Sequence, residues 1–264
     1  MSDQFEAVLT RSRRLSVSTM DFRFRRTGAG AVSYEPGQFF RFTFEDHRGS
    51  FERSYSLCNF TDAEPIEMDI VVSTVEGGRA SEFLFMGEPG IKTQVKGPYG
   101  RLLIPKTLPE RLFLVATSVG IAPFLPMLSA LKNRNQKVIL LFGVRDRSEF
   151  LYQQELLGLD WPGLTLVVCY SRMVADLEAH EHEGYVTAHI QSFAPNPDTD
   201  HFLICGNPNM IDDCYGQLKV DGFSARQVVR EKYLFAVQEK PLQKSALTDE
   251  QKALIAAKLK KHSR

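Results

Sequence analysis

Short apolar runs separated by turn residues characterise the first hundred positions of the chain. Strands are predicted at residues 31–34, 39–44, 67–72 and 92–95, where apolar side chains alternate with polar ones or are β-branched or aromatic. Gly, Pro and Asp stand between these runs. Several short strands at this spacing predict a small antiparallel β-barrel.

The hydrophobic pattern changes after about residue 107. Near-continuous apolar runs now occur at 112–116, 138–142, 164–168 and 202–205, as is typical of strands buried on both faces of a parallel sheet. A fifth strand is predicted at 227–233, and helical periodicity appears at 124–132, 149–157, 186–193 and 210–218. Alternating strands and helices predict βαβ units and a doubly wound α/β domain with a parallel sheet.

The chain of 264 residues has room for two domains of ordinary size. We expect an N-terminal β-barrel over residues 1–107, an α/β domain over residues 108–236 and a C-terminal extension over residues 237–264. In the extension, Thr248 and Gln251 have the spacing of a capping box, and apolar residues follow at helical intervals. We expect this helix to dock on the body of the protein, with contact to a partner as the alternative.

Composition narrows the functional classes. Basic and acidic residues balance at 32 each, so no global field favours nucleic acid. No stretch approaches the roughly 18 apolar residues of a membrane span, and the N-terminus lacks the apolar core of a signal peptide. The four cysteines are scattered without a C-x-x-C pair, which argues against a zinc or iron–sulfur site and for a reducing cytoplasm. The histidines and acids of residues 180–183 have no second cluster at ligand spacing, so no metal site is predicted.

One segment is locally basic. Residues 11–26 contain a single acid, Asp21, and six arginines: Arg11, Arg13, Arg14, Arg23, Arg25 and Arg26. This pattern fits a solvated strand face, or a surface that meets an acidic protein partner.

Two motifs in the first domain are suited to a phosphate-bearing aromatic ligand. Arg53 can grip a phosphate through two hydrogen bonds, and Tyr55 lies on the same strand face and offers a flat ring. Ser56 can donate to or accept from a ring nitrogen. Further on, Gly77 and Gly78 let the backbone approach a ligand, and Ser81 stands where a helix with free N–H groups could begin. Each motif alone also fits an ordinary strand or turn.

The order and spacing of these motifs along the chain match those of a known family. Together with Gly97-Pro98-Tyr99-Gly100, the loop around Gly120, Gly143-Val144-Arg145 and Cys205-Gly206-Asn207-Pro208, they closely resemble the ferredoxin–NADP reductase family over residues 30–235. The resemblance implies FAD in the barrel. Arg53 would bind its pyrophosphate, Tyr55 would pack on the isoalloxazine ring and Ser56 would lie near N5. The same resemblance adds Ser54, Val72, Gly78, Arg79, Ala80 and Ser81 to the cofactor-binding set.

In the second domain the resemblance implies a nicotinamide nucleotide site. Thr117 and Gly120 would line it, and Cys205, followed by Gly206, would lie beside the reacting nicotinamide carbon. Ser118 and Val119 depart from the Gly and Thr that are common there. Glu231 would supply an acid near the flavin, and Tyr233 or Phe235 would cover the ring; the alternative is simply a last strand with a buried aromatic. The residues given catalytic roles are therefore Ser56, Cys205, Glu231 and Tyr233.

The preferred nucleotide is NADP, with NAD as the alternative. Ser171 and Arg172 end the third predicted strand of this domain, where NADP-preferring relatives often place Ser-Arg, and Arg145 matches another phosphate-binding position. Two cations and a hydroxyl would suit a 2′-phosphate, whereas NAD sites tend to offer an acid to the ribose diol. Against this, Tyr185 stands where some NADP-binding relatives supply another arginine.

The resemblance implies an FAD-dependent oxidoreductase that moves electrons between NADPH and a ferredoxin or flavodoxin. The flavin would accept a hydride at N5 and release electrons singly, so no catalytic nucleophile is required. Because no cysteine cluster could hold an iron–sulfur centre, the one-electron partner would be a separate protein. Two alternatives are an NADH-linked reductase component of an oxygenase and a non-catalytic redox-sensing subunit.

Overall fold

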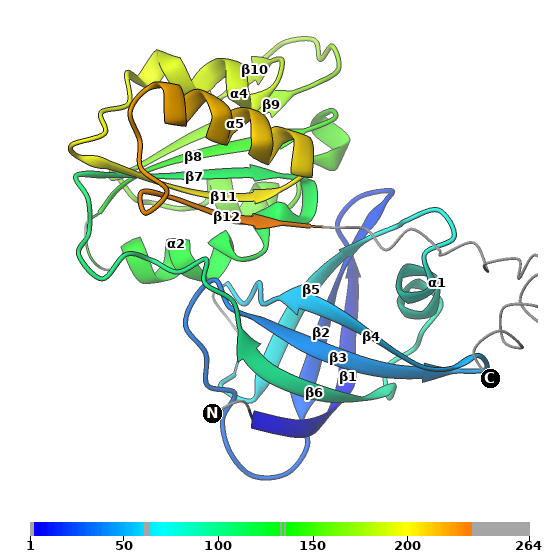
Figure 1. Cartoon of the computed structure of the whole chain (residues 1–264). Helices are drawn as coiled ribbons and strands as arrows, with labels where there is room; N and C mark the ends of the chain where they lie inside the picture. The colour runs from blue at the N-terminus through cyan, green and yellow to red at the C-terminus, as the bar shows by residue number, and fades with distance from the viewer. Residues whose placement is uncertain (1–2, 61–63, 133, 135, 234–264) are drawn as a thin grey trace, which may run out of the picture.

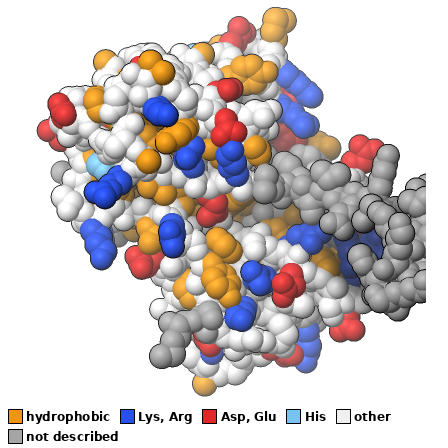
Figure 2. All heavy atoms as spheres, viewed as in Figure 1, with side chains coloured by type: hydrophobic (Ala, Val, Ile, Leu, Met, Phe, Trp, Pro, Cys, Tyr) orange, Lys and Arg blue, Asp and Glu red, His pale blue; other side chains and the backbone are white. Residues whose placement is uncertain are grey.

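The computed structural model describes residues 3–60, 64–132, 134 and 136–233 (Figure 1). It contains two six-stranded β-sheets, each in its own lobe. The first sheet is antiparallel and curled, and the second is parallel with helices on both faces, as the sequence predicts. On the viewed face, acidic and basic side chains are interspersed over both lobes (Figure 2).

The antiparallel sheet forms the half-barrel. Its strands are β1 (Asp3–Arg14), β2 (Thr19–Arg26), β3 (Phe39–Asp46), β4 (Gly49–Ser56), β5 (Glu67–Ser73) and β6 (Lys92–Tyr99), in the order β4-β3-β6-β1-β2-β5. Helix α1 (Arg79–Phe85) follows β5. Phe40, Phe42 and Phe44 alternate inward from β3 and are fully buried, which gives the sheet an aromatic core.

Parts of this domain differ from the sequence-based prediction. Residues 31–34 form no strand, although they alternate in polarity, because Val32 and Tyr34 pack on the barrel core from a loop. The apolar pattern does not delimit strands β1, β2 and β4, because charged residues interrupt their apolar positions. Strand faces are nevertheless predicted for residues 11–26 and for Arg53 and Tyr55.

The parallel sheet has the order β10-β9-β8-β7-β11-β12. Its strands are β7 (Arg111–Thr117), β8 (Lys137–Val144), β9 (Leu164–Tyr170), β10 (Glu181–Glu183), β11 (Asp200–Gly206) and β12 (Val228–Lys232). The short β10 is an addition to the five predicted strands. In β7, Leu112 and Leu114 face one apolar cluster while Phe113 and Val115 face another, so both faces are buried.

Helices cover both faces of this sheet (Figure 1). The α-helices are α2 (Phe124–Lys132), α3 (Gln153–Leu157), α4 (Val186–His189) and α5 (Pro208–Val220). Three 3-10 turns accompany them: η1 (Ser118–Ile121), η2 (Arg147–Glu149) and η3 (Ile190–Phe193). The helix predicted at 149–157 is shorter, because Tyr152 has a φ of 56° and interrupts it.

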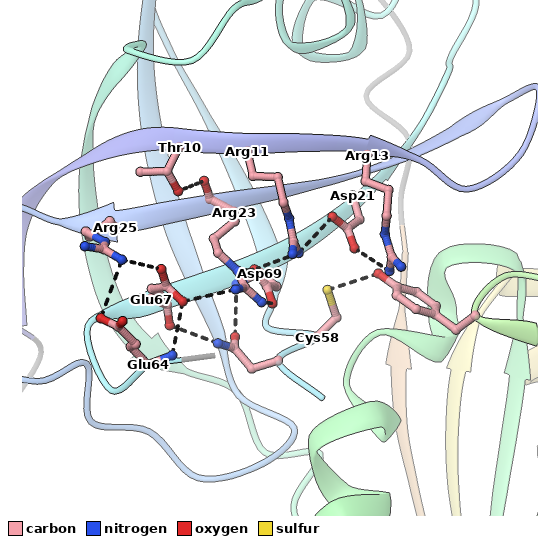
Figure 3. A network of polar contacts seen from close by, with 12 residues as sticks. Thr10, Arg11, Arg13, Asp21, Arg23, Arg25, Cys58, Glu64, Glu67 and Asp69 are labelled. Atoms are coloured by element: carbon pink, nitrogen blue, oxygen red, sulfur yellow. Dashed lines mark hydrogen bonds and ion pairs between the residues drawn. The ribbon is translucent and has the colours of Figure 1, made fainter. Parts of the chain in front are cut away.

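The basic segment of β1 and β2 is neutralised within the molecule. Five of its six arginines form ion pairs, and Arg23 is buried between Asp69 and Glu67 of β5 (Figure 3). These acids lie more than forty residues from Arg23 in sequence, so the local sequence does not reveal the pairs. The segment is therefore neither a plain solvated face nor a free basic surface.

Two further observations concern the described residues. None of the helices that they form has the length and apolar composition to cross a membrane. The same residues contain no group of three or more His, Cys, Asp or Glu arranged to hold a metal ion.

Candidate functional site

The first groove lies where the edge strands β4 and β5 of the curled sheet approach one another. Its volume is about 640 Å³, within the range of small-ligand and cofactor sites. We call it the barrel groove, because most of its wall comes from β3, β4, β5 and the segment 75–81. It is lined by all nine residues that the sequence assigns to FAD: Arg53, Ser54, Tyr55, Ser56, Val72, Gly78, Arg79, Ala80 and Ser81.

Strand β4 presents a cation and an aromatic ring to this groove. Arg53 and Tyr55 are two residues apart and therefore share a strand face. The guanidinium of Arg53 donates to the Glu52 carbonyl at 2.7 Å, while the ring of Tyr55 packs edge-on against Phe42 with centroids 5.8 Å apart. Burial raises the pKa of Tyr55, which keeps its hydroxyl protonated. The strand thus offers a fixed ring and a positive charge side by side.

Backbone donors face the groove from the start of α1. The helix begins at Arg79 with Gly78 as its N-cap, so the prediction that Ser81 starts it is wrong by two residues. Ser81 is buried, and its hydroxyl donates to the Gly78 carbonyl at 2.9 Å. The first intrahelical bond runs from the Glu82 N–H to Gly78, so the N–H groups of residues 79–81 precede the helical ladder and are suited to an anion.

Gly78 and Arg79 have defined positions in this cradle. A Cβ on Gly78 would lie 2.8 Å from the Val75 Cβ and 2.9 Å from the Ser81 hydroxyl, which leaves no room for a side chain. The Arg79 guanidinium is held by Asp46, with Nε 2.9 Å from Oδ2, and lies over the Phe51 ring. Arg79 therefore contributes its backbone to the cradle, while its side chain anchors the β3–β4 turn.

A hydrogen-bonded chain closes the barrel groove. The Tyr233 hydroxyl donates to Ser56 Oγ at 2.7 Å, and Ser56 Oγ donates to Glu231 Oε1 at 3.0 Å. Burial raises the pKa of Glu231, against the opposing hydrogen bond from Ser56. The structure thus brings together three of the four residues given catalytic roles.

Cys205 is the fourth residue given a catalytic role, and it is not part of this hydrogen-bonded chain. It is fully buried at the end of β11, where it pairs in register with Glu231, and it lines neither groove. Burial raises the pKa of its thiol, and a hydrogen bond with Tyr233 opposes that shift. The thiol that the resemblance places beside the nicotinamide is therefore close enough to Tyr233 for that side chain to influence its pKa.

The second groove lies between the two domains. We call it the interdomain groove; its volume is about 720 Å³. One wall is the edge where the parallel strands end, the usual ligand position in such sheets, and it includes Thr117, Arg145, Ser171 and Gly206. The opposite wall comes from the barrel: Ser18, Ser73, Thr74 and Val75.

Two glycines allow the loops of this groove to pack closely. Gly206 has a φ of 129°, and a Cβ there would lie 2.4 Å from Thr117 Oγ1. Gly120 does not line the groove, because it packs against β11; a Cβ there would lie 2.4 Å from the Cys205 carbonyl oxygen. Ser118, which departs from the family pattern, is exposed and holds a left-handed φ of 51° that glycine adopts more readily.

The interdomain groove carries charges of both signs. Arg145 and Ser171 line it, together with the acids Glu149 and Asp213. Arg172 does not line it; its Nη1 lies 3.2 Å from Asp146 Oδ2. Tyr185, 71% exposed, adds an aromatic surface at the groove.

The barrel wall of this groove was missed by sequence reasoning. Ser18 and Thr74 belong to the other domain, and only folding brings them opposite Arg145. Helical periodicity at 149–157 predicts a helix that begins at Glu149. Serine, threonine and a lone glutamate in turns have no sequence signature that distinguishes groove walls from solvent-exposed loops.

The residues present fit a bound flavin dinucleotide and a nicotinamide nucleotide. The barrel groove combines a guanidinium, three backbone N–H donors and a tyrosine ring, which suit a pyrophosphate joined to an aromatic system. The interdomain groove joins it at Tyr233, which lines both. Phe235, the other proposed ring cover, and the extension 237–264 lie outside the described residues.

Comparison with known proteins identifies both domains. Residues 6–104 match an oxidoreductase FAD-binding domain, and residues 114–215 match an oxidoreductase NAD-binding domain. Ferredoxin–NADP reductase B of Sorangium cellulosum is 30% identical over 220 residues, which cover 80% of this chain and 89% of that protein. The toluate 1,2-dioxygenase electron transfer component of Pseudomonas putida is 24% identical, with 87% and 67% covered.

A solved structure has the same fold. The ferredoxin NADP+ reductase from Neisseria gonorrhoeae with bound FAD and NADP superposes with a TM-score of 0.76 at 20% identity. The match covers 87% of this chain and 98% of that one, so the paired arrangement of curled and parallel sheets is common to both proteins.

Proposed function

The chain belongs to the ferredoxin–NADP reductase family, and on that premise we propose that it transfers electrons between NADPH and a separate ferredoxin or flavodoxin through FAD. It is an FAD- and NAD(P)-binding oxidoreductase, so the non-catalytic alternative is set aside. We assign residues 1–107 to FAD, 108–236 to the nucleotide and 237–264 to a separate extension.

The observation that carries the proposal is the junction of the two grooves at Tyr233. A ring in the barrel groove and a ring in the interdomain groove would meet there. FAD, when bound, supplies the ability to take up a hydride and to release electrons one at a time. The protein's part is to orient the two rings and to exclude water.

We assign the chain's residues to these tasks. Arg53, Ser54 and Val72, with residues 78–81, would hold the flavin dinucleotide, and Tyr55 would pack on its ring. Ser56 would lie beside the ring, and its hydroxyl could switch its hydrogen bond from Glu231 to the ring. Tyr233 occupies the junction, so its side chain must swing aside before a nicotinamide can reach Cys205.

The nucleotide preference is the finer part of the proposal. Arg145 and Ser171 in the groove support NADPH, since both can hold a 2′-phosphate. NADH is the second candidate, because Arg172 is paired with Asp146 and the groove also contains Glu149 and Asp213. An oxygenase iron–sulfur component is the corresponding alternative partner, in line with the toluate dioxygenase relative.

The partner is tested by supplying the purified holoenzyme with NADPH and either a ferredoxin or a flavodoxin. We expect absorbance changes that report reduction of one carrier at a rate that saturates with its concentration. Turnover with ferricyanide but with neither carrier would contradict the proposed partner class and leave the oxidoreductase chemistry in place.

A further inference from the structure

We propose that a polar clasp between the two domains is a positioning device that aligns the nucleotide with the flavin. The clasp consists of Arg13, Ser16, Ser18 and Cys58 on the barrel side and Glu149, Tyr152 and Glu155 on the other. This inference rests on the proposed hydride transfer between nucleotide and flavin.

The three clasp residues of the second domain are regularly spaced in sequence. They are Glu149 at the end of η2, Tyr152 just before α3 and Glu155 within α3, at intervals of three residues, and each contacts the barrel. Tyr152 is 5% exposed and holds the left-handed φ of 56° that splits the predicted helix. A bulky residue in that conformation is costly and is retained only where its surroundings fix it, which is consistent with a positioning role.

Glu149 is the centre of the first contact. Its carboxylate accepts hydrogen bonds from Ser16 Oγ at 2.7 Å and from Ser18 Oγ at 2.9 and 3.0 Å. Ser16 is buried, and both serines belong to the turn that joins β1 to β2. Hydrogen bonds to a charged acceptor are among the stronger ones, so this contact couples two segments that lie about 130 residues apart in sequence.

Arg13 and Tyr152 make the second contact. The guanidinium of Arg13 lies 2.8 Å from Glu155 Oε1 and 3.0 Å from Asp21 Oδ2, and its centre is 5.6 Å from the Tyr152 ring. The Tyr152 hydroxyl lies 3.4 Å from Cys58 Sγ in a buried site.

The barrel side of the clasp is stiffened by the arginine–acid network. In Figure 3, Arg13 and Asp21 lie at one end of this network, next to Cys58 and the second domain. Arg11 links Asp21 to Asp69, with nitrogen–oxygen distances of 3.6 and 3.9 Å. Networks of this kind hold side chains in one arrangement more firmly than isolated surface pairs do.

The clasp lies at the nucleotide groove. Ser18 and Glu149 both line it, and the N–H of Thr74, another wall residue, donates to the Ser18 carbonyl at 2.7 Å. Both serine hydroxyls donate to the Glu149 carboxylate, which therefore joins the two walls of the groove. Loosening the clasp would let the walls shift, and a misplacement of about 1 Å can slow a reaction roughly 100-fold.

The test uses the FAD-loaded enzyme and the variants Glu149→Ala and Ser16→Ala/Ser18→Ala. We expect the limiting rate of flavin reduction by NADPH to fall about 10- to 100-fold in both. The apparent nucleotide Kd should change less than about threefold, and oxidation of the photoreduced flavin by ferricyanide should be unchanged. Combining the variants should add little, since both remove the same interaction.

Amide hydrogen exchange provides a readout independent of activity. In the variants, exchange should accelerate in residues 13–19 and 147–156 and remain unchanged in the core strands β3 and β8. Glu88→Ala is the matched control, because Glu88 is exposed and lines neither groove; it should leave all readouts at wild-type values. If a variant folds poorly, Ser18→Ala alone gives a milder disruption.

The outcomes separate the inference from the proposed function. Unchanged limiting rates in all variants would overturn the positioning role, and unchanged exchange would overturn the clasp itself. A wild-type flavin that neither NADPH nor NADH reduces would instead overturn the proposed function, while the exchange data would still test the clasp.

Discussion

The two grooves are built differently. The barrel groove is made mostly of one sheet and one helix start, and its ligand-directed groups are a guanidinium, a ring and backbone donors. The interdomain groove has walls from both domains and carries acids beside Arg145. A groove built mostly by one domain suits a resident cofactor, whereas a groove whose two walls come from different domains suits a nucleotide that enters and leaves and whose fit depends on domain alignment.

The sharpest test of this separation is Gly206→Ala. The new Cβ would lie 2.4 Å from Thr117 Oγ1 at a φ that L-residues rarely adopt, so the interdomain groove must distort. We expect at least a roughly 100-fold loss of nucleotide-dependent flavin reduction, with FAD content retained. Gly216→Ala in α5 is the control, because no atom beyond its chain neighbours and the adjoining helix backbone lies within 4 Å of its new Cβ. If Gly206→Ala lost FAD to the same extent as it lost nucleotide-dependent reduction, the two grooves would not be independent.

Arg53→Ala is the reverse test: it should impair FAD binding in the barrel groove and leave nucleotide binding unchanged. Losing a charge-assisted hydrogen bond of about 1.5–3 kcal/mol should weaken FAD binding about 10- to 150-fold. Nucleotide binding to the apoprotein, measured by calorimetry, should stay the same. Arg48→Ala, at an exposed turn, should leave both affinities unchanged. Normal FAD affinity in Arg53→Ala would remove Arg53 from the cofactor site.

Glu231 lines the barrel groove, where Ser56 links it to Tyr233, and it should impose a pH dependence. Its pKa is raised by burial, so the neutral form persists to a higher pH than in an exposed glutamate. Above that pKa its negative charge would oppose arrival of a hydride nearby, and the limiting rate of reduction should fall as pH rises. Glu231→Gln should abolish that fall in stopped-flow pH profiles, and an unaltered profile would contradict this role.

Asp146→Asn should have the smallest effect. It removes a negative charge and frees Arg172, so the NADPH/NADH ratio of kcat/KM should rise about two- to fivefold, as expected for a partly exposed ion pair worth about 0.5–1 kcal/mol. NADH kinetics should change little, because NADH lacks the 2′-phosphate. The rise in the NADPH/NADH ratio should be smaller at high salt. If kcat/KM changed equally for both nucleotides, Asp146 would have no role in discriminating between them.

The two domains were unequally predictable from the sequence. The apolar runs around Leu112–Leu114 identified the parallel sheet because its strands are buried on both faces. In β2, Arg23 is buried by pairing with Asp69 and Glu67, so a charged residue occupies a core position and the apolar pattern does not delimit the strand. Local pattern cannot reveal such pairs, because their partners lie on distant strands.

The site shows the same division. Arg53, Tyr55 and Gly78 lie within short motifs, and the structure places all three in one groove. Ser18 and Glu149 gain their place only from the docking of two domains, and the left-handed Tyr152 breaks a segment with helical periodicity. Interdomain geometry was therefore the part that the sequence could not supply.

The most direct measurement is anaerobic stopped-flow absorbance of the FAD-loaded protein mixed with NADPH and, separately, with NADH. We expect rapid bleaching of the oxidised flavin with NADPH and slower bleaching with NADH. A flavin that remains oxidised with both nucleotides would contradict the claim that the two grooves bring nucleotide and flavin together for hydride transfer.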